Sequence, residues 1–149
     1  PFTTDKEQLE YTLTVSDTRL TMGVLSMGNP HAVMTVENVQ TAPVASLGAT
    51  IEGHPKFTDR VNVGFMQVLS RDEIKLRVFE RGAGETLACG TGACAAVVHG
   101  IRKNLLNNAV TVHLPGGKLS ITWEGNGTAA WLSGPTASVF EGTINLHNR

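Results

Sequence analysis

The sequence predicts an α+β fold that is rich in strands. Apolar and polar residues alternate along most of the chain, as between Leu9 and Val15, which is typical of strands that bury one face. Glycine-rich breaks at 116–117 and 125–127 favour hairpins between the later strands. One segment, 91–103, is instead rich in Ala and Val and predicts a helix buried on most sides. Many strands and one apolar helix together suggest a curved sheet or a barrel wrapped around that helix.

Segments with the strand pattern recur along the whole chain. They are, in order, 9–15, 22–26, 31–36, 61–69, 74–79, 110–114, 119–123, 129–132 and 138–146. The helix over 91–103 is expected to end near Asn104, with Arg102 and Lys103 at the negative end of its dipole. A weaker helix is predicted over 39–51, interrupted early by Pro43.

Length and charge narrow the function classes. The 149 residues suit one domain, 41% of them are hydrophobic, and 12 basic against 13 acidic residues leave a net charge of −1. This balance gives no electrostatic footprint for nucleic acid or a membrane surface. No apolar run approaches the roughly 20 residues that span a bilayer, so a cytoplasmic protein is expected. Because the chain starts at Pro1 without Met, we expect it to be part of a longer protein.

The two cysteines, Cys89 and Cys94, are too few for a disulfide scaffold. They also lack the CxxC and His-x3-His spacings of a zinc site, so no metal is expected. A reducing compartment with one reactive thiol fits this cysteine usage.

Cys89 stands immediately before Gly90-Thr91-Gly92, where the apolar helix is expected to begin. A helix N-terminus offers unpaired N–H groups and a positive dipole end, which hold an anion and favour thiolate over thiol. Thr91 is expected to act as the N-cap. A free cysteine is usually a small buried hydrophobe, but a packing cysteine needs no flanking glycines. We therefore interpret Cys89 as functional and Cys94, within an Ala-rich run, as core.

Four short blocks stand in order along the chain. They are Gly28-Asn29-Pro30-His31, Val61-Asn62-Val63, Glu80-Arg81 and Ala88-Cys89-Gly90-Thr91-Gly92. Together with the surrounding GETLACGTGACAA they closely resemble the diaminopimelate epimerase family, and the resemblance runs over nearly the whole chain. A member of this family is built from two similar lobes, and this chain resembles the second.

The resemblance implies an isomerase that interconverts LL- and meso-2,6-diaminoheptanedioate with two cysteines and without cofactor or metal. It implies that 1–134 form the C-terminal lobe and that 135–149 return to an N-terminal lobe that this chain lacks. It also implies a cytoplasmic homodimer of the full-length protein. Because the second catalytic cysteine belongs to the lobe that this chain lacks, we expect this chain alone to be inactive.

The resemblance also suggests residue roles. Cys89 would exchange a proton at the α-carbon, Glu80 would assist it, and His31 would help to deprotonate the partner cysteine on the other lobe. Asn29, Asn62 and the Glu80-Arg81 pair would contact substrate, and Gly90 and Thr91 would hold a carboxylate. Each has an ordinary structural alternative: a β-turn at 28–31, an outward-facing Asn62, and a solvated charge pair at 80–81. Glu85 and the remaining histidines, His54, His99, His113 and His147, are expected to be structural or exposed.

Other functions remain open at this point. A related racemase or isomerase of the same fold would use a similar glycine turn. A hydrolase or transferase could use Cys89 as a nucleophile with His31, although the Glu80-Arg81 block has no place in that mechanism. A lobe that binds a ligand without catalysis is the third possibility.

Overall fold

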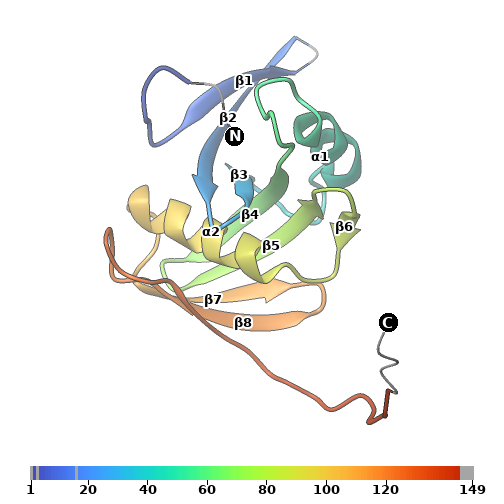
Figure 1. Ribbon diagram of the computed structural model, residues 1–149. Coiled ribbons are helices and arrows are strands. Elements are labelled where there is room, and N and C mark those ends of the chain that lie inside the picture. The colour runs from blue at the N-terminus through green and yellow to red at the C-terminus, as the bar shows by residue number, and fades with distance from the viewer. Residues whose placement is uncertain (1, 3, 16, 145–149) are drawn as a thin grey trace.

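A computed structural model describes residues 2, 4–15 and 17–144 of the chain, as a mixed sheet with two helices (Figure 1). The prediction of an α+β fold is therefore confirmed. The strands are β1 Tyr11–Val15, β2 Thr18–Ser26, β3 Pro30–Thr35, β4 Asn62–Ser70, β5 Glu73–Glu80, β6 Gly84–Thr86, β7 Ala109–Leu114, β8 Gly117–Thr122 and β9 Trp131–Ser133. The helices are α1 Val44–Glu52 and α2 Gly90–Arg102.

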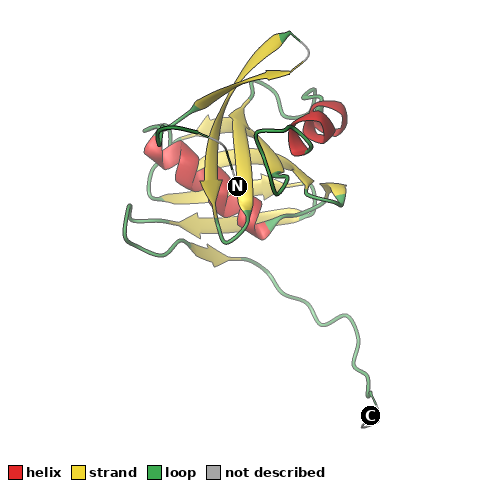
Figure 2. Ribbon diagram, turned by 45° about the horizontal axis from the view of Figure 1, so that its top comes forward, coloured by secondary structure: helices red, strands yellow, loops and turns green. Residues whose placement is uncertain are grey.

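The sheet has the order β1-β2-β3-β4-β5-β7-β8-β9, with β6 added beside β5. The pairs β3–β4 and β5–β7 are parallel and the other pairs are antiparallel. The sheet bends around α2, which lies across it, but among the described residues β1 and β9 remain its two unjoined ends (Figures 1 and 2). A closed barrel is therefore not formed by the part of the chain that the structure describes.

Two hydrophobic clusters fill the two faces of the sheet. The first packs α2 against β5, β7 and β8, with Ile74, Leu76 and Val78 pointing to the helix. Phe79, whose side chain points to the opposite face of β5, packs in the second cluster together with residues of α1 and of β1 to β4. Burying both faces of β5 fixes the position of its end, where Glu80 begins the candidate site.

The structure corrects several predicted boundaries. The strand expected over 22–26 begins at Thr18, and the helix expected over 39–51 begins only at Val44, because Pro43 occupies its N-cap position. The short strand β6 was not predicted. The helix predicted over 91–103 is confirmed within one residue as α2.

The strand predicted over 138–146 is wrong for its described part. Residues 138–144 belong to no strand and extend away from the rest of the chain (Figure 1), and 145–146 lie outside the described residues. Val139, Phe140 and Ile144 are each more than 80% exposed. Alternation becomes a strand only beside a partner edge, and the described residues provide none here. Among these residues, no helix has the length and hydropathy needed to cross a membrane.

Candidate active site

The candidate site forms where the starts of β3, β4 and α2 meet the end of β5. In the sheet register His31 lies opposite Asn62, and Val63 lies opposite Phe79, so that Asn62 and Glu80 are neighbours across β4 and β5. The N-terminus of α2 reaches the same place through the Thr91 hydroxyl, which accepts a hydrogen bond from Asn29 in the turn before β3. The structure thus brings together the residues that the sequence singled out: Asn29, His31, Asn62, Glu80, Arg81, Cys89, Gly90 and Thr91.

Cys89 is the N-cap of α2. Its backbone is extended, and its Sγ accepts a hydrogen bond from the Gly92 N–H at 3.4 Å. The Thr91 hydroxyl lies 3.7 Å from the same sulfur. The predicted position of the thiol at a helix N-terminus is confirmed, but Thr91 is not the N-cap as expected, because the chain turns into the helix two residues earlier.

Burial dominates the acidity of this thiol. Cys89 is 6% exposed, and burial raises its pKa above the ordinary value, against the lowering by the Gly92 N–H and by Thr91. The expectation of a helix N-terminus that favours thiolate is therefore wrong in its net direction. Cys94 is 9% exposed and packs in the first hydrophobic cluster, as predicted, so the expected contrast between an open and a buried cysteine is absent.

Glu80 lies beside the sulfur at the end of β5. Its negative charge and a hydrogen bond to the thiol contribute to raising the pKa of Cys89, because both favour the protonated thiol. The Thr86 hydroxyl donates to Glu80 Oε1 at 2.5 Å and holds the carboxylate in place. Thr86 thus fixes the orientation of the carboxylate whose charge acts on the Cys89 thiol.

His31 is 1% exposed and neutral. Burial lowers its pKa to about 4, and the positive charge of Arg81 adds to this lowering, while Glu80 opposes it. His31 Nε2 lies 3.0 Å from Asn29 Oδ1, an oxygen that can only accept, so Nε2 carries the proton and Nδ1 is the basic nitrogen. Asn29 Nδ2 in turn donates to Thr91 Oγ1 at 3.4 Å.

Asn62 is 4% exposed, which excludes the alternative of an outward-facing position. Its Nδ2 donates to the Pro30 carbonyl at 2.9 Å, and its Oδ1 accepts from the Arg81 N–H at 3.0 Å. Asn62 therefore ties the turn before β3 to the end of β5. The Arg81 guanidinium donates to the Asp59 carbonyl at 2.9 Å.

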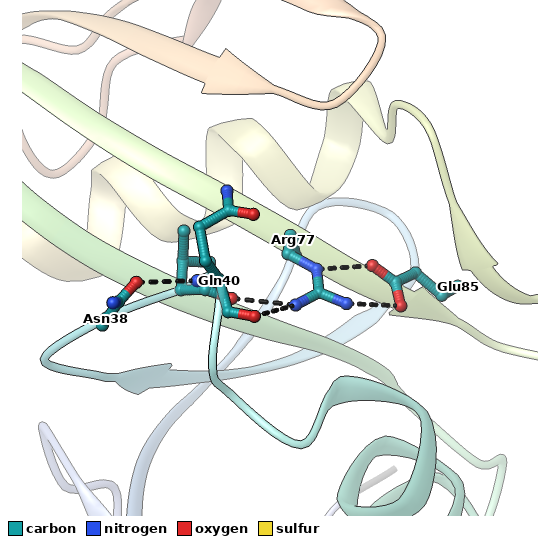
Figure 3. A network of polar contacts seen from close by, with 5 residues as sticks. Asn38, Gln40, Arg77 and Glu85 are labelled. Carbon is teal, nitrogen blue, oxygen red and sulfur yellow. Dashed lines mark hydrogen bonds and ion pairs between the residues drawn. The ribbon is translucent and has the colours of Figure 1, made fainter.

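Glu85 and Arg77 form a separate structural ion pair. Two bonds of 2.6 and 2.8 Å join their side chains, and this contact raises the pKa of Arg77. Arg77 Nη1 also donates to the carbonyls of Val39 and Gln40 (Figure 3). None of these partners belongs to the candidate site, in keeping with the structural role expected for Glu85, although it lies in β6 and not in a loop.

The other histidines lie outside the site. His113 pairs with Glu73, and His54 accepts a hydrogen bond from the Lys56 N–H. His99 is 2% exposed inside α2, and His147 lies outside the described residues. Within 2, 4–15 and 17–144, no three His, Cys, Asp or Glu side chains are grouped as a metal site would require.

Sequence reasoning missed Thr86 and Glu52. Thr86 holds Glu80, and Glu52 accepts a hydrogen bond from the Gly82 N–H at 2.6 Å. Glu52 is 5% exposed, and a buried carboxylate of this kind usually has a specific partner. Its place at the end of a weak helix pattern gave no signal, because its partner is 30 residues away in the chain.

The arrangement suits proton transfer next to a bound carboxylate. The start of α2 supplies N–H groups and a positive dipole end for an anion, and Arg81 adds a fixed positive charge. A thiol, a carboxylate and a neutral imidazole lie beside this anion site. All three are side-chain types that serve as general acids or bases.

A family model described as diaminopimelate epimerase matches residues 23–139 of the chain. Diaminopimelate epimerase of Teredinibacter turnerae is 58% identical over 98% of this chain and 53% of that protein. The protein of the same name from Chromobacterium violaceum is 57% identical over 98% and 53%, respectively. The one from Variovorax paradoxus is 63% identical over 85% of this chain and 43% of its own length. The chain thus spans about half the length of the first two relatives.

Among solved structures, the chain is similar in fold to a phenazine biosynthesis protein of the PhzF family from Enterococcus faecalis. The TM-score is 0.51 at 18% identity, over 64% of this chain and 34% of that one. At this identity the likeness concerns the fold alone.

Proposed function

Because the chain belongs to the diaminopimelate epimerase family, we propose that it is the C-terminal lobe of an enzyme that interconverts LL- and meso-2,6-diaminoheptanedioate. The observation that carries the proposal is the convergence of a buried thiol, an oriented carboxylate and a neutral imidazole at a helix N-terminus. This set of groups can move a proton at a carbon next to a bound carboxylate.

The proposed reaction inverts one α-carbon by two proton transfers. A thiolate on one face removes the α-proton, and the electron pair of the broken C–H bond spreads into the adjoining carboxylate. A thiol on the opposite face then delivers a proton to the same carbon, so no oxidant or reductant is consumed. Cys89 supplies one of the two sulfur groups, and the N–H groups of Gly90 and Thr91 hold the carboxylate on which negative charge develops.

Glu80 supplies the base for Cys89. Because burial raises the pKa of Cys89, the resting group is the thiol, which is the form that donates a proton. To act in the reverse direction the thiol must first lose its proton, and the Glu80 carboxylate beside it accepts that proton. Arg81 and Asn29 bind the polar ends of the substrate, and Asn62 contacts the substrate through its side-chain amide.

His31 serves the second cysteine, which this chain does not contain. With Nε2–H engaged by Asn29, the free Nδ1 is the atom that would take a proton from a thiol on the N-terminal lobe. Exposed apolar side chains around the site support such a lobe as the covering partner. Leu87, two residues before Cys89, is 70% exposed, and Leu132, whose side chain lies against Gly90, is 44% exposed.

The remaining family features belong to the same proposal. Residues 1–134 form the lobe, 135–149 return to the N-terminal lobe and pair there, and the barrel-like sheet is completed in the full-length protein. That protein is a cytoplasmic homodimer. The exposed apolar residues of 138–144 support this role for the last segment.

The nucleophilic alternative is less well supported. A Cys–His nucleophile needs the imidazole within hydrogen-bond reach of the sulfur. Here the Cys89 sulfur is in hydrogen-bond contact with the Gly92 N–H and the Thr91 hydroxyl, and His31 Nε2 is bonded to Asn29 instead. A racemase acting on another amino acid stays closer to the geometry, since it would share the same proton transfers.

Incubation of the full-length protein with LL-diaminopimelate in deuterated water tests the proposal. We expect inversion with deuterium at the α-carbon. Cys89→Ala should abolish the inversion and Cys89→Ser should lose most of it, because a hydroxyl is too weak an acid near neutral pH. This chain alone should show neither inversion nor deuterium exchange. Release of a hydrolysis product, or inversion that persists in Cys89→Ala, would refute the mechanism.

A further inference from the structure

Glu52, the last residue of α1, is a buried carboxylate without an assigned role. It is 5% exposed, and its two oxygens have different partners. Oε1 accepts from the Gly82 N–H at 2.6 Å, and Oε2 accepts from Arg60 Nη2 at 2.9 Å. A buried charge that is paired and hydrogen-bonded in this way fixes the geometry of the groups around it.

The turn that Glu52 holds is the one that carries Arg81. Gly82 follows Arg81 directly and has φ +76°, in the left-handed region that glycine adopts at low cost. The turn closes with a hydrogen bond of 3.1 Å from the Ala83 N–H to the Glu80 carbonyl. This turn connects β5 to β6, and its only anchor through a carboxylate in the described structure is Glu52.

Two further contacts hold Arg81 from the other side. Its backbone N–H donates to Asn62 Oδ1 at 3.0 Å, and its Nη1 donates to the Asp59 carbonyl at 2.9 Å. Asp59 adjoins Arg60, the partner of Glu52, so one segment meets both the carboxylate and the guanidinium. Among the described residues, the Arg81 side chain donates this single hydrogen bond, which leaves its other N–H groups to face a ligand.

We propose that Glu52 is a positioning residue that orients the Arg81 guanidinium for a substrate carboxylate. The inference rests on the proposed function, because it assigns Arg81 to substrate binding. Glu52 acts through the Gly82 N–H and the Arg60 side chain and does not touch the substrate. With its charge matched by Arg60, the carboxylate can sit near the site without repelling an anionic ligand.

The consequence is a change in affinity and not in the proton-transfer step. Glu52→Ala removes the acceptor for the Gly82 N–H and frees the turn, so Arg81 must be ordered when substrate binds. We expect KM for diaminopimelate to rise roughly tenfold while kcat stays within roughly threefold. Glu52→Gln keeps an oxygen for the Gly82 N–H but loses the charge that pairs with Arg60, so it should recover only part of this affinity.

The experiment compares Glu52→Ala and Glu52→Gln in the full-length protein with Glu85→Ala as the matched control. Glu85 also pairs with an arginine, at 2.6 Å, but outside the site. The control should keep its KM. An unchanged KM in Glu52→Ala, or a loss confined to kcat, would overturn the inference. If Glu52→Ala does not fold, as judged by circular dichroism, Glu52→Gln must still show a smaller rise in KM, and an unchanged KM there would overturn it.

Amide hydrogen exchange separates this inference from the proposed function. Glu52→Ala should accelerate exchange at the Gly82 amide, and Glu85→Ala should not. If the wild-type protein fails to incorporate deuterium into diaminopimelate, the proposed function is wrong. If Gly82 exchange is then also the same in Glu52→Ala as in the wild-type protein, the Glu52 contact is refuted as well. Active wild-type protein with unchanged Gly82 exchange in Glu52→Ala would refute the positioning role alone.

Discussion

Two buried histidines should make the protein sensitive to mild acid. His31 and His99 are 1% and 2% exposed, and burial lowers the pKa of each to about 4. The unfolded chain binds protons at the ordinary histidine pKa of about 6.5, so the stability from neutral, buried rings is fully present above that pH and is lost as pH falls towards 4. For each ring, the free energy of unfolding should fall by about 2 kcal/mol between pH 7 and pH 5, and for the pair by about 4 kcal/mol.

Urea unfolding of the protein at pH 7, 6 and 5, followed by circular dichroism, measures this loss. His99→Gln removes one titrating ring, so the fall between pH 7 and pH 5 should shrink by about half. His54→Gln is the control, because it removes a histidine without removing a buried ring. A fall of the same size in His99→Gln and in the wild-type protein, or a stability that rises in acid, would refute the argument.

Three further predictions concern the site and the core. Glu80→Gln should lower kcat for diaminopimelate more than it raises KM, whereas Arg81→Ala should mainly raise KM; exchanged effects in steady-state kinetics would reverse the two roles. Burial raises the pKa of both Cys89 and Cys94, so brief alkylation of this chain near neutral pH should label both thiols slowly. Rapid modification of either thiol, measured by mass spectrometry, would contradict their burial. A Cβ at Gly48 would lie 2.6 Å from Phe79 Cβ, so Gly48→Ala should lower the free energy of unfolding by about 1–3 kcal/mol. Gly53→Ala is the control, because a Cβ there would have its nearest atom at 3.8 Å and should not lower it. Equal urea midpoints for the two variants would contradict the packing.

Most of the fold could be predicted from local patterns. The helix α2 and the strands β3, β4, β5 and β7 lie within one or two residues of the ranges expected from periodicity. The three-residue strand β6 was missed because it is too short to show alternation. The strand expected at 138–146 shows the opposite limit, since alternation reports a tendency and cannot supply a partner edge.

The candidate site could be predicted as a set of residues but not as a set of contacts. Flanking glycines marked Cys89, a strand end marked Glu80, and the family resemblance marked Asn29. The sheet register and the contact between Asn29 and Thr91 bring their segments together. Glu52 could not be predicted in this way, because its partner Gly82 contributes only a backbone N–H. Hydrogen bonds to backbone groups carry no residue-type signal, so a site held by them is visible only after folding.

The acidity of Cys89 illustrates how opposing effects decide a role. A helix N-terminus alone favours thiolate, and the Gly92 N–H does act in that direction, but burial is the larger effect and the neighbouring Glu80 adds to it. Covering the site with a second lobe would desolvate the sulfur further and strengthen the preference for the thiol. A thiol that rests protonated can donate readily, but it can act as a base only when a neighbour removes its proton. The same carboxylate that raises the pKa of Cys89 is therefore the group that makes the reverse transfer possible, and Thr86 keeps it oriented to do so.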